Sequence, residues 1–219
     1  MPDFVCTQCQ RTFSVSDAAL AKYPGWTPKV CLRCKPTKKK ASAARTSTKK
    51  SGRGSSRSRE MDLPVAEVLE RFTEGPDTGI FTDGAAEPNP GPGGWGAVYV
   101  VDGEIENERW GHDPATTNNR MELTALIAGY RMAPDDEPLK IYSDSQLCVN
   151  TINSWAAGWA KNGWKRKTGE IKNLDLVKTA YELALEKPKV QLVWIQAHSG
   201  FRWNEYADSL ATAYRRDTK

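Results

Sequence analysis

The spacing of apolar residues changes near residue 62 of this 219-residue chain. Before that point large apolar residues are few, and residues 36–60 contain none. From there on Leu63, Val65, Val68, Leu69 and Phe72 recur at helical spacing, which predicts a short amphipathic helix within residues 62–77. The main folded part of the chain should therefore begin after this lead-in.

Residues 78–219 alternate between the two-residue period of strands and the 3.6-residue period of helices. Strands are expected near Ile80–Phe81 and at Trp95–Val101, Glu104–Trp110, Lys140–Ser143 and Val190–Ile195, and helices at Asn119–Met132, Ser145–Ser154, Leu174–Leu185 and Asn204–Tyr214. Asp102-Gly103 is a two-residue hairpin signal. A hairpin followed by strand–helix crossovers predicts an α/β fold with a mixed sheet and helices on its faces.

An acidic residue interrupts the first apolar run. Asp83 follows Ile80 and Phe81 and precedes a stretch dense in Gly and Pro that continues to Gly96. We expect Asp83 at the edge of a strand, where a carboxylate can hold a metal ion. The stretch after it is too rich in Gly and Pro for a helix or a central strand, and we expect it to be a loop whose backbone approaches something closely.

The net charge of +4 conceals two opposite halves. Residues 1–60 hold 14 Lys/Arg against 3 Asp/Glu, whereas the remainder holds 17 against 24. This asymmetry indicates an arm that binds a polyanion, joined to a domain that uses carboxylates. No apolar run is long enough to span a membrane and no signal-peptide core is present, so we expect a soluble, intracellular, cytoplasmic protein.

The first 35 residues carry two cysteine pairs, Cys6-x-x-Cys9 and Cys31-x-x-Cys34. Four thiolates at this spacing suit a tetrahedral structural Zn²⁺ ion, and a redox-active dithiol is the alternative. So short a segment cannot build a core alone, and a metal would supply most of its folding energy. We therefore expect a zinc-binding module at 1–35, a basic disordered linker at 36–61, a lead-in at 62–77 and a catalytic domain at 78–219.

Four acidic residues occupy unusual positions: Asp83, Glu122 on the helix at Asn119–Met132, Asp144 after the strand at Lys140–Ser143, and Asp208 on the last helix. Each alone is more simply a cap or turn residue. Together with their surroundings they resemble the type 1 ribonuclease H family over residues 78–215. The resembling segments, in the order of that family, are Thr82-Asp-Gly-Ala, Asn89-Pro-Gly-Pro-Gly-Gly-Trp-Gly, Thr116-Thr-Asn-Asn-Arg-Met-Glu-Leu, Tyr142-Ser-Asp-Ser-Gln, Trp194-Ile-Gln-Ala-His-Ser-Gly and Asn204-Glu-Tyr-Ala-Asp.

The resemblance implies a five-stranded ribonuclease H-like sheet and a two-metal site with Asp83, Glu122, Asp144 and Asp208 as ligands. Oxygen-only ligands suit Mg²⁺, with Mn²⁺ as a substitute, and two such ions can stabilise both the attacking and the leaving oxygen of a phosphodiester. His198 matches a mobile histidine of the family that assists proton transfer or product release, although a lone loop histidine often has no role. His112 has no such setting and is interpreted as structural.

The resemblance also implies contacts to an RNA strand from the backbone of Gly84 and Ala86 and from Asn118, Asn119 and Gln146. Amide side chains suit this because they donate and accept hydrogen bonds together. Asn89 is expected to order the Gly/Pro stretch. A helix N-cap is the alternative reading for one of the two adjacent asparagines.

Residues 155–173 are the second recognition candidate because tryptophans alternate there with cationic residues. By resemblance this is a basic protrusion that grips DNA, with Trp155 and Trp159 as binding residues, although tryptophans at helical spacing are more often core. Thr117 and Asn173 match the DNA-phosphate pocket of the family, where Ala115 replaces an arginine of some relatives.

The sequence thus predicts a monomeric endonuclease that cuts the RNA strand of RNA/DNA hybrids and leaves 5′-phosphate and 3′-hydroxyl ends. A non-catalytic nucleic-acid-binding module and an integrase-like DNA nuclease are the alternatives. The cysteine module is expected to bind nucleic acid, and docking to a protein partner is the alternative.

Overall fold

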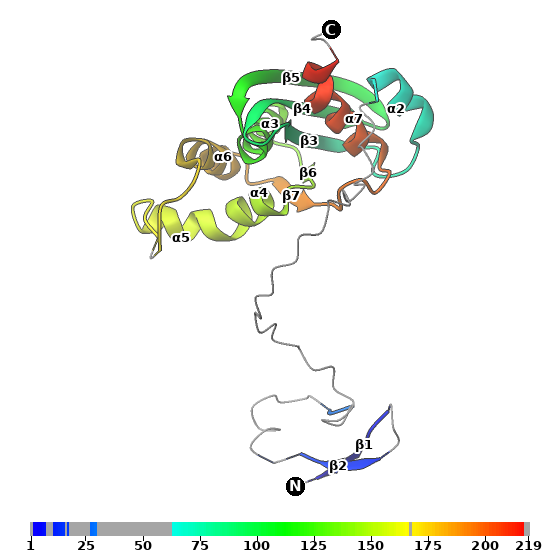
Figure 1. Ribbon diagram of the computed structural model, residues 1–219, viewed down its shortest axis with the longest axis vertical. Coiled ribbons are helices and arrows are strands. Elements are labelled where there is room, and N and C mark those ends of the chain that lie inside the picture. The colour runs from blue at the N-terminus through cyan, green and yellow to red at the C-terminus, as the bar shows by residue number, and fades with distance from the viewer. Residues whose placement is uncertain are drawn as a thin grey trace, which may run out of the picture. The chain divides into compact units, whose positions relative to one another are not determined.

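The structure is a computed structural model that describes residues 2–7, 11–15, 17, 27–29, 63–166 and 168–216 (Figure 1). The chain divides into two compact units, residues 1–55 and 56–219. Of the predicted zinc ligands only Cys6 is described, and Cys9, Cys31 and Cys34 lie outside the described residues. The predicted linker at 36–61 lies outside them as well.

The described part of the N-terminal unit is a small antiparallel pair of strands, β1 (Asp3–Val5) and β2 (Thr12–Ser14). Cys6 follows β1 and is fully buried. The Thr7 amide donates to the Lys29 carbonyl over 2.9 Å, which brings the chain after the first cysteine beside the residues that precede Cys31.

The C-terminal unit is built on a five-stranded sheet in the order β5-β4-β3-β6-β7 (Figure 1). Its strands are β3 (Gly79–Ala86), β4 (Gly91–Val101), β5 (Glu104–Thr116), β6 (Leu139–Ser143) and β7 (Val190–Trp194). Strand β4 is antiparallel to both β3 and β5, whereas β6 runs parallel to β3 and β7 runs parallel to β6. The expected mixed sheet is therefore confirmed.

The expected helices occur in the predicted order with small shifts of their ends. The helices are α2 (Val65–Arg71), α3 (Asn118–Met132), α4 (Gln146–Asn150), α5 (Ala156–Lys161), α6 (Leu174–Glu186) and α7 (Arg202–Thr212), the last continued by a 3-10 turn at Ala213–Arg215. Helix α5 is an additional one that was not expected from the sequence. A π-helical turn, Thr151–Trp155, joins α4 to α5 where one helix was expected.

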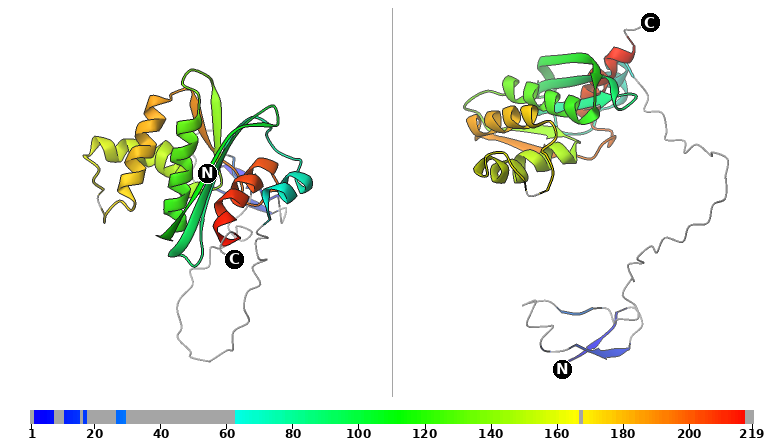
Figure 2. Two further views of the ribbon diagram at one scale, coloured as in Figure 1. Left: turned by 90° about the horizontal axis from the view of Figure 1, so that it is seen from above. Right: turned by 60° about the vertical axis from the view of Figure 1, so that its left-hand side comes forward.

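Helices cover the two faces of the sheet and enclose two cores. Figure 2 shows α3 on one side of the sheet and α7 on the other. Ile80 of β3 belongs to the core under α3, whereas the next residue, Phe81, belongs to the core under α7 and α2. Both side chains are fully buried, which explains why the central strand reads as a continuous apolar run rather than an alternating one.

Two predictions about the first acidic segment are wrong. Asp83 lies within β3 and pairs with Gly96 of β4, so it is not at the end of the strand. Most of the stretch expected to be a loop belongs to strands: residues 84–86 lie in β3 and residues 91–96 in β4, and only residues 87–90 connect the two.

The glycines of β4 have a packing role that explains this error. A Cβ atom at Gly94 would lie 2.3 Å from the Ala211 carbonyl oxygen, and one at Gly96 would lie 2.5 Å from Leu210 Cβ. Helix α7 therefore rests directly on the backbone of β4. The segment does bring its backbone close to another element, and that element is the helix that carries Asp208.

Candidate active site

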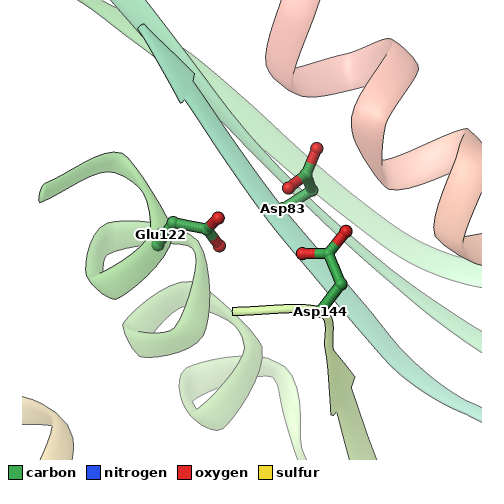
Figure 3. A group of neighbouring side chains, drawn as sticks. All are labelled: Asp83, Glu122 and Asp144. Carbon is green, nitrogen blue, oxygen red and sulfur yellow. The ribbon is translucent and has the colours of Figure 1, made fainter. Parts of the chain in front are cut away.

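Three carboxylates converge at the centre of the sheet (Figure 3). Asp83, Glu122 and Asp144 each offer an oxygen, and these oxygens all lie within 4.8 Å of one another. Asp83 comes from the middle of β3, Glu122 from the start of α3, and Asp144 from the residue after β6. Asp83 is buried and the other two are half-buried.

Strand pairing and one glycine bring these carboxylates together. β3 and β6 are parallel and pair up to Thr82 opposite Ser143, so the next residue of each strand is an aspartate. At Gly84 a Cβ atom would lie 2.1 Å from the Glu122 backbone nitrogen. The start of α3 can lie against β3, and Glu122 can reach Asp83, only because this residue has no side chain.

Asp208 of α7 adjoins this group from the other side. Its carboxylate accepts a hydrogen bond from Asp83 when Asp83 is protonated, and its charge also acts on Glu122. All four predicted carboxylates are thus neighbours, although the group whose oxygens lie within 4.8 Å of one another contains only the first three.

Burial and mutual repulsion make this a costly place for negative charge. Burial, followed by the charges of Asp144, Glu122 and Asp208, raises the pKa of Asp83 well above its usual range. Burial, followed by Asp144 and Asp208, raises the pKa of Glu122 in the same way. Both carboxylates would be stabilised by a cation between them.

The donor set fits a divalent metal ion. The Glu122 Oε2 atom is buried and has no hydrogen-bond partner in the described part of the chain, a costly state for a carboxylate oxygen. The ligands are all oxygen, which is the set that Mg²⁺ and Mn²⁺ prefer. An ion here would pair with the unpartnered oxygen and offset the repulsion.

Asp144 is held by a residue that the sequence interpretation did not single out. Burial raises the pKa of Asp144, while a hydrogen bond from the Asn204 side chain and the charge of His198 oppose that rise. Asn204 lies four residues before Asp208 on α7, and this spacing was the one sequence signal that could have found it.

His198 lies near Asp144 in the exposed segment between β7 and α7. Its backbone is in the left-handed region, with φ of 50°, which is uncommon for a residue with a side chain. The other histidine, His112, lies exposed on β5, away from this segment in the chain.

Some of the residues expected to contact RNA form hydrogen bonds within the protein. The Ala86 amide donates to Asn118 Oδ1 over 2.6 Å, and the Asn118 amide donates to Asn89 Oδ1 over 3.3 Å. These bonds tie the connection after β3 to the start of α3, so Asn89 does help to order it. The helix cap is Thr117, whose side chain accepts from the Arg120 amide, and the reading of an asparagine as the cap is wrong.

A cavity of about 490 Å³ lies beside the start of α3. Asn119, Trp155, Trp159 and Asn173 line it together with the cationic residues Arg166 and Lys172. The two tryptophan rings lie 6.0 Å apart, and Trp155 is 42% exposed, so it is not a core residue. Four of the predicted substrate contacts therefore share one cavity.

Trp164 and Gln146 lie elsewhere. Trp164 packs edge-on against Tyr181, with Lys178 over its ring. Gln146 begins α4 with an exposed side chain, and its amide donates to the Asp144 carbonyl over 2.9 Å.

A mixed sheet in this strand order, with converging acidic residues on two adjacent strands and a helix, defines a metal-binding hydrolase of the nuclease class. The family model RNase H matches residues 76–216. This chain is 47% identical over 133 residues to a ribonuclease H of Dechloromonas aromatica (strain RCB), covering 60% of this chain and 88% of that one. A longer ribonuclease H from Methylorubrum extorquens (strain PA1) is 43% identical, with 63% of this chain and 60% of that one covered.

The solved structure of LC9-RNase H1, described as a type 1 RNase H with the type 2 active-site motif, is 28% identical, with a TM-score of 0.51. The alignment covers 67% of this chain and 76% of that chain. The chain therefore belongs to the ribonuclease H family, and it is a ribonuclease H enzyme. Within the described residues no helix is long and apolar enough to cross a membrane.

Proposed function

We propose that this enzyme is an endonuclease that hydrolyses the RNA strand of RNA/DNA hybrids and leaves 5′-phosphate and 3′-hydroxyl ends. The observation that carries the proposal is the convergence of Asp83, Glu122 and Asp144, with Asp208 adjoining, in a place that disfavours bare negative charge. Relatives named ribonuclease H at 43–47% identity support it.

Asp83, Glu122, Asp144 and Asp208 would hold two divalent cations, Mg²⁺ or Mn²⁺, with Asp83 shared between them. Such ions stabilise charge on the attacking and leaving oxygens of a phosphodiester. Asp83 suits the shared position because it is the most central carboxylate, and the other three all act on its charge.

His198 would assist proton transfer or product release. Its place in an exposed segment beside Asp144 supports this role, because it can meet substrate and solvent. The left-handed backbone at this residue also fits a functional position, where uncommon conformations concentrate.

Recognition would be divided between the two strands of the hybrid. Asn119, Gln146 and the backbone near Gly84 and Ala86 would follow the RNA strand, whose 2′-hydroxyls both donate and accept hydrogen bonds. Trp155, Trp159, Thr117 and Asn173, with Arg166 and Lys172, would hold the DNA strand. The cavity lined by Trp155, Trp159, Asn173, Arg166 and Lys172 supports the DNA contacts, because cations attract phosphates and aromatic rings stack on bases. Asn119 lines the same cavity, so the RNA contacts would adjoin the DNA contacts.

The test is cleavage of a labelled RNA/DNA hybrid, compared with duplex DNA and duplex RNA, with and without Mg²⁺. We expect Mg²⁺-dependent cuts within the RNA of the hybrid alone. Cleavage of duplex DNA would favour an integrase-like nuclease, and binding without cleavage would favour a non-catalytic module. Asp144→Asn should abolish cleavage and preserve hybrid binding, and near-normal turnover of that variant would contradict the assignment.

For the N-terminal residues 1–35 we propose a Zn²⁺ site made of Cys6, Cys9, Cys31 and Cys34, joined through a basic linker (36–61) to the catalytic domain. The two Cys-x-x-Cys pairs support it, as does the hydrogen bond from Thr7 to Lys29 near both pairs. Thiolates kept for a metal suit a reducing compartment such as the cytoplasm. Metal analysis of the purified chain should find about one Zn²⁺, lost in Cys6→Ser.

A further inference from the structure

Asn204 has an unusual position for an amide side chain. It is 1% exposed, its side chain bonds to the Asp144 carboxylate, and its Oδ1 atom is buried without a partner in the described part of the chain. Since Asp144 accepts, the Nδ2 group of Asn204 is the donor. The Nδ2 group of the amide therefore donates to an acidic site residue, whereas its Oδ1 atom is a buried acceptor that still needs a donor.

Helix α7 presents Asn204 and Asp208 toward the site together. Residues four apart lie on one face of a helix, one turn from each other. The first bonds to Asp144 and the second to Asp83. One helix thus contacts the two aspartates that β3 and β6 bring into register.

The backbone of Asp144 is also held by neighbouring residues. Its carbonyl oxygen accepts from the Trp194 indole over 3.0 Å and from the Gln146 amide over 2.9 Å. These bonds fix the backbone of Asp144, and its carboxylate accepts from its own backbone amide. Asn204 is the side chain that donates to that carboxylate.

We propose that Asn204 is a positioning residue, which orients the Asp144 carboxylate for metal binding through Nδ2 and holds a buried water on Oδ1. This inference rests on the proposed two-cation function. A buried acceptor is satisfied by an N–H or O–H donor, and at 1% exposure only a molecule as small as water can reach it. The amide suits this place because its two ends differ: one donates to the carboxylate and the other accepts from the water.

The experiment compares Asn204→Ala and Asn204→Asp with the wild-type full chain. Asn204→Ala should raise the Mg²⁺ concentration for half-maximal cleavage by about tenfold or more, the usual cost of losing a residue that orients a metal ligand. The rise in Tm on adding Mg²⁺, a readout that needs no turnover, should shift to higher Mg²⁺ concentration by the same factor. The KM for hybrid should stay the same, because Asn204 does not reach substrate.

Asn204→Asp keeps the shape but replaces the donor by a second carboxylate. It should lower kcat about tenfold or more even in saturating Mg²⁺, without a change in the KM for hybrid. It keeps the test decisive if the alanine variant fails to fold. Asn153→Ala is the matched control: Asn153 donates its amide to the Leu192 carbonyl over 2.9 Å, so its loss should lower Tm and leave the Mg²⁺ dependence unchanged.

Variants of Asn204 that lose only Tm, with an unchanged Mg²⁺ dependence and kcat, would overturn the proposal. A crystal structure with Mg²⁺ should show a water within hydrogen-bonding distance of Asn204 Oδ1, and a protein donor in that place would overturn the water-binding part. Failure of the wild-type chain to cut hybrid would instead overturn the proposed function, so the two failures are distinguishable.

Discussion

Glu122 and Asp83 illustrate how a few side chains set the chemistry of the whole domain. Glu122 keeps one buried oxygen without a partner in the described part of the chain, and Asp83 is surrounded by three other carboxylates. Neither arrangement is favourable for an isolated protein in water. Both become favourable if the groups are ligands, which makes the two residues suitable for testing by neutralisation.

Glu122→Gln should lower kcat by about two to three orders of magnitude, the scale of removing one group that stabilises charge in a transition state. Hybrid affinity should be retained, because the side chain keeps its size and faces the carboxylates rather than the recognition cavity. Single-turnover cleavage and equilibrium hybrid binding measure the two effects. Glu106→Gln, an equal charge change on an exposed strand residue, is the control and should leave both unchanged. Loss of both cleavage and hybrid binding in Glu122→Gln would instead indicate misfolding.

Asp83→Asn should stabilise the protein in EDTA at pH 7. Burial and its acidic neighbours raise the pKa of Asp83 in the native state, so the native state binds its proton more tightly than the unfolded chain. Stability is then lost as pH rises from the ordinary value of about 4 toward the raised native pKa. The variant lacks this loss, so its Tm should exceed that of the wild type by about 2–4 °C for each kcal/mol relieved.

The Tm difference should shrink as pH is lowered toward 4, because the wild-type carboxyl then becomes protonated in the unfolded chain as well as in the native state. Mg²⁺ should reverse the order, because it stabilises the wild type through binding to the native state. Thermal melts across pH 4–7, with EDTA or with Mg²⁺, test both points. An Asp83→Asn Tm below that of the wild type in EDTA at pH 7 would count against a repulsive acidic site.

Sequence motifs located the carboxylates and His198 but did not find Asn204. Asp83, Glu122, Asp144 and Asp208 stand in recognisable segments, and the structure brings them together. Asn204 stands in one of the same segments, yet its role depends on where α7 lies relative to Asp144. An interaction between residues 60 positions apart is a property of packing, which residue spacing along the chain does not record.

Among the elements, α7 depends most on the absence of side chains at two positions of the neighbouring strand β4. It lies on the bare backbone of β4 at Gly94 and Gly96. That close approach sets how deeply Asn204 and Asp208 reach into the site. A side chain at either of these two glycines would push the helix outward.

Gly96→Ala should therefore lower both stability and activity. Its new methyl would lie 2.5 Å from Leu210 Cβ and 2.6 Å from the Ala207 carbonyl oxygen. Such overpacking costs about 1–3 kcal/mol. Urea unfolding and hybrid cleavage in saturating Mg²⁺ measure the outcome, and we expect kcat to fall more than the folded fraction does, because the shift moves Asp208.

Gly158→Ala is the control for that change. Gly158 is exposed on α5, and a Cβ atom there would meet nothing within 4 Å. The substitution should stabilise the chain by up to about 1 kcal/mol, because alanine favours helix more than glycine does. Equal effects of the two substitutions would argue against a specific role for the bare surface of β4.

Element order could be predicted from apolar periodicity, but the Gly/Pro-rich first part of β4 could not. The hairpin at Asp102-Gly103 and the helices that become α3 and α6 stand within one or two residues of their expected limits. A strand was expected at Trp95–Val101, but Gly and Pro argued against a strand at 91–94, where β4 begins, because both weaken isolated strands. Close packing with α7 outweighs that local preference, and a helix more than 100 residues away is not visible in the local pattern.

At the scale of the whole molecule, charge is divided between the two ends of the chain. Residues 1–60 carry a large positive excess and the remainder a negative one. A catalytic unit that is itself acidic would gain from a basic partner segment when it meets a polyanion. The two compact units allow this segment to be removed without cutting into the sheet.

Deleting residues 1–60 should raise the apparent KM for hybrid and flatten its dependence on salt. Binding to phosphates weakens with salt because it releases counterions, with a slope of about 0.9 per neutralised phosphate on a double-logarithmic plot for B-form DNA. The truncated chain neutralises fewer phosphates, so its slope should be smaller. Steady-state cleavage between about 50 and 200 mM salt measures the change. A truncated chain with the same KM and the same salt slope would assign the N-terminal residues to another task, such as docking to a protein.

The outer strand β5 bears on how copies of this protein meet one another. It is 13 residues long and, in the described part of the chain, pairs only with β4. An open edge of that length invites the edge of a second copy and, eventually, aggregation. The charged side chains of Glu104, Glu106 and Arg109 are exposed along it and oppose such pairing. Strand β5 can thus carry an exposed tryptophan, Trp110, beside charges that oppose pairing with the edge of a second copy.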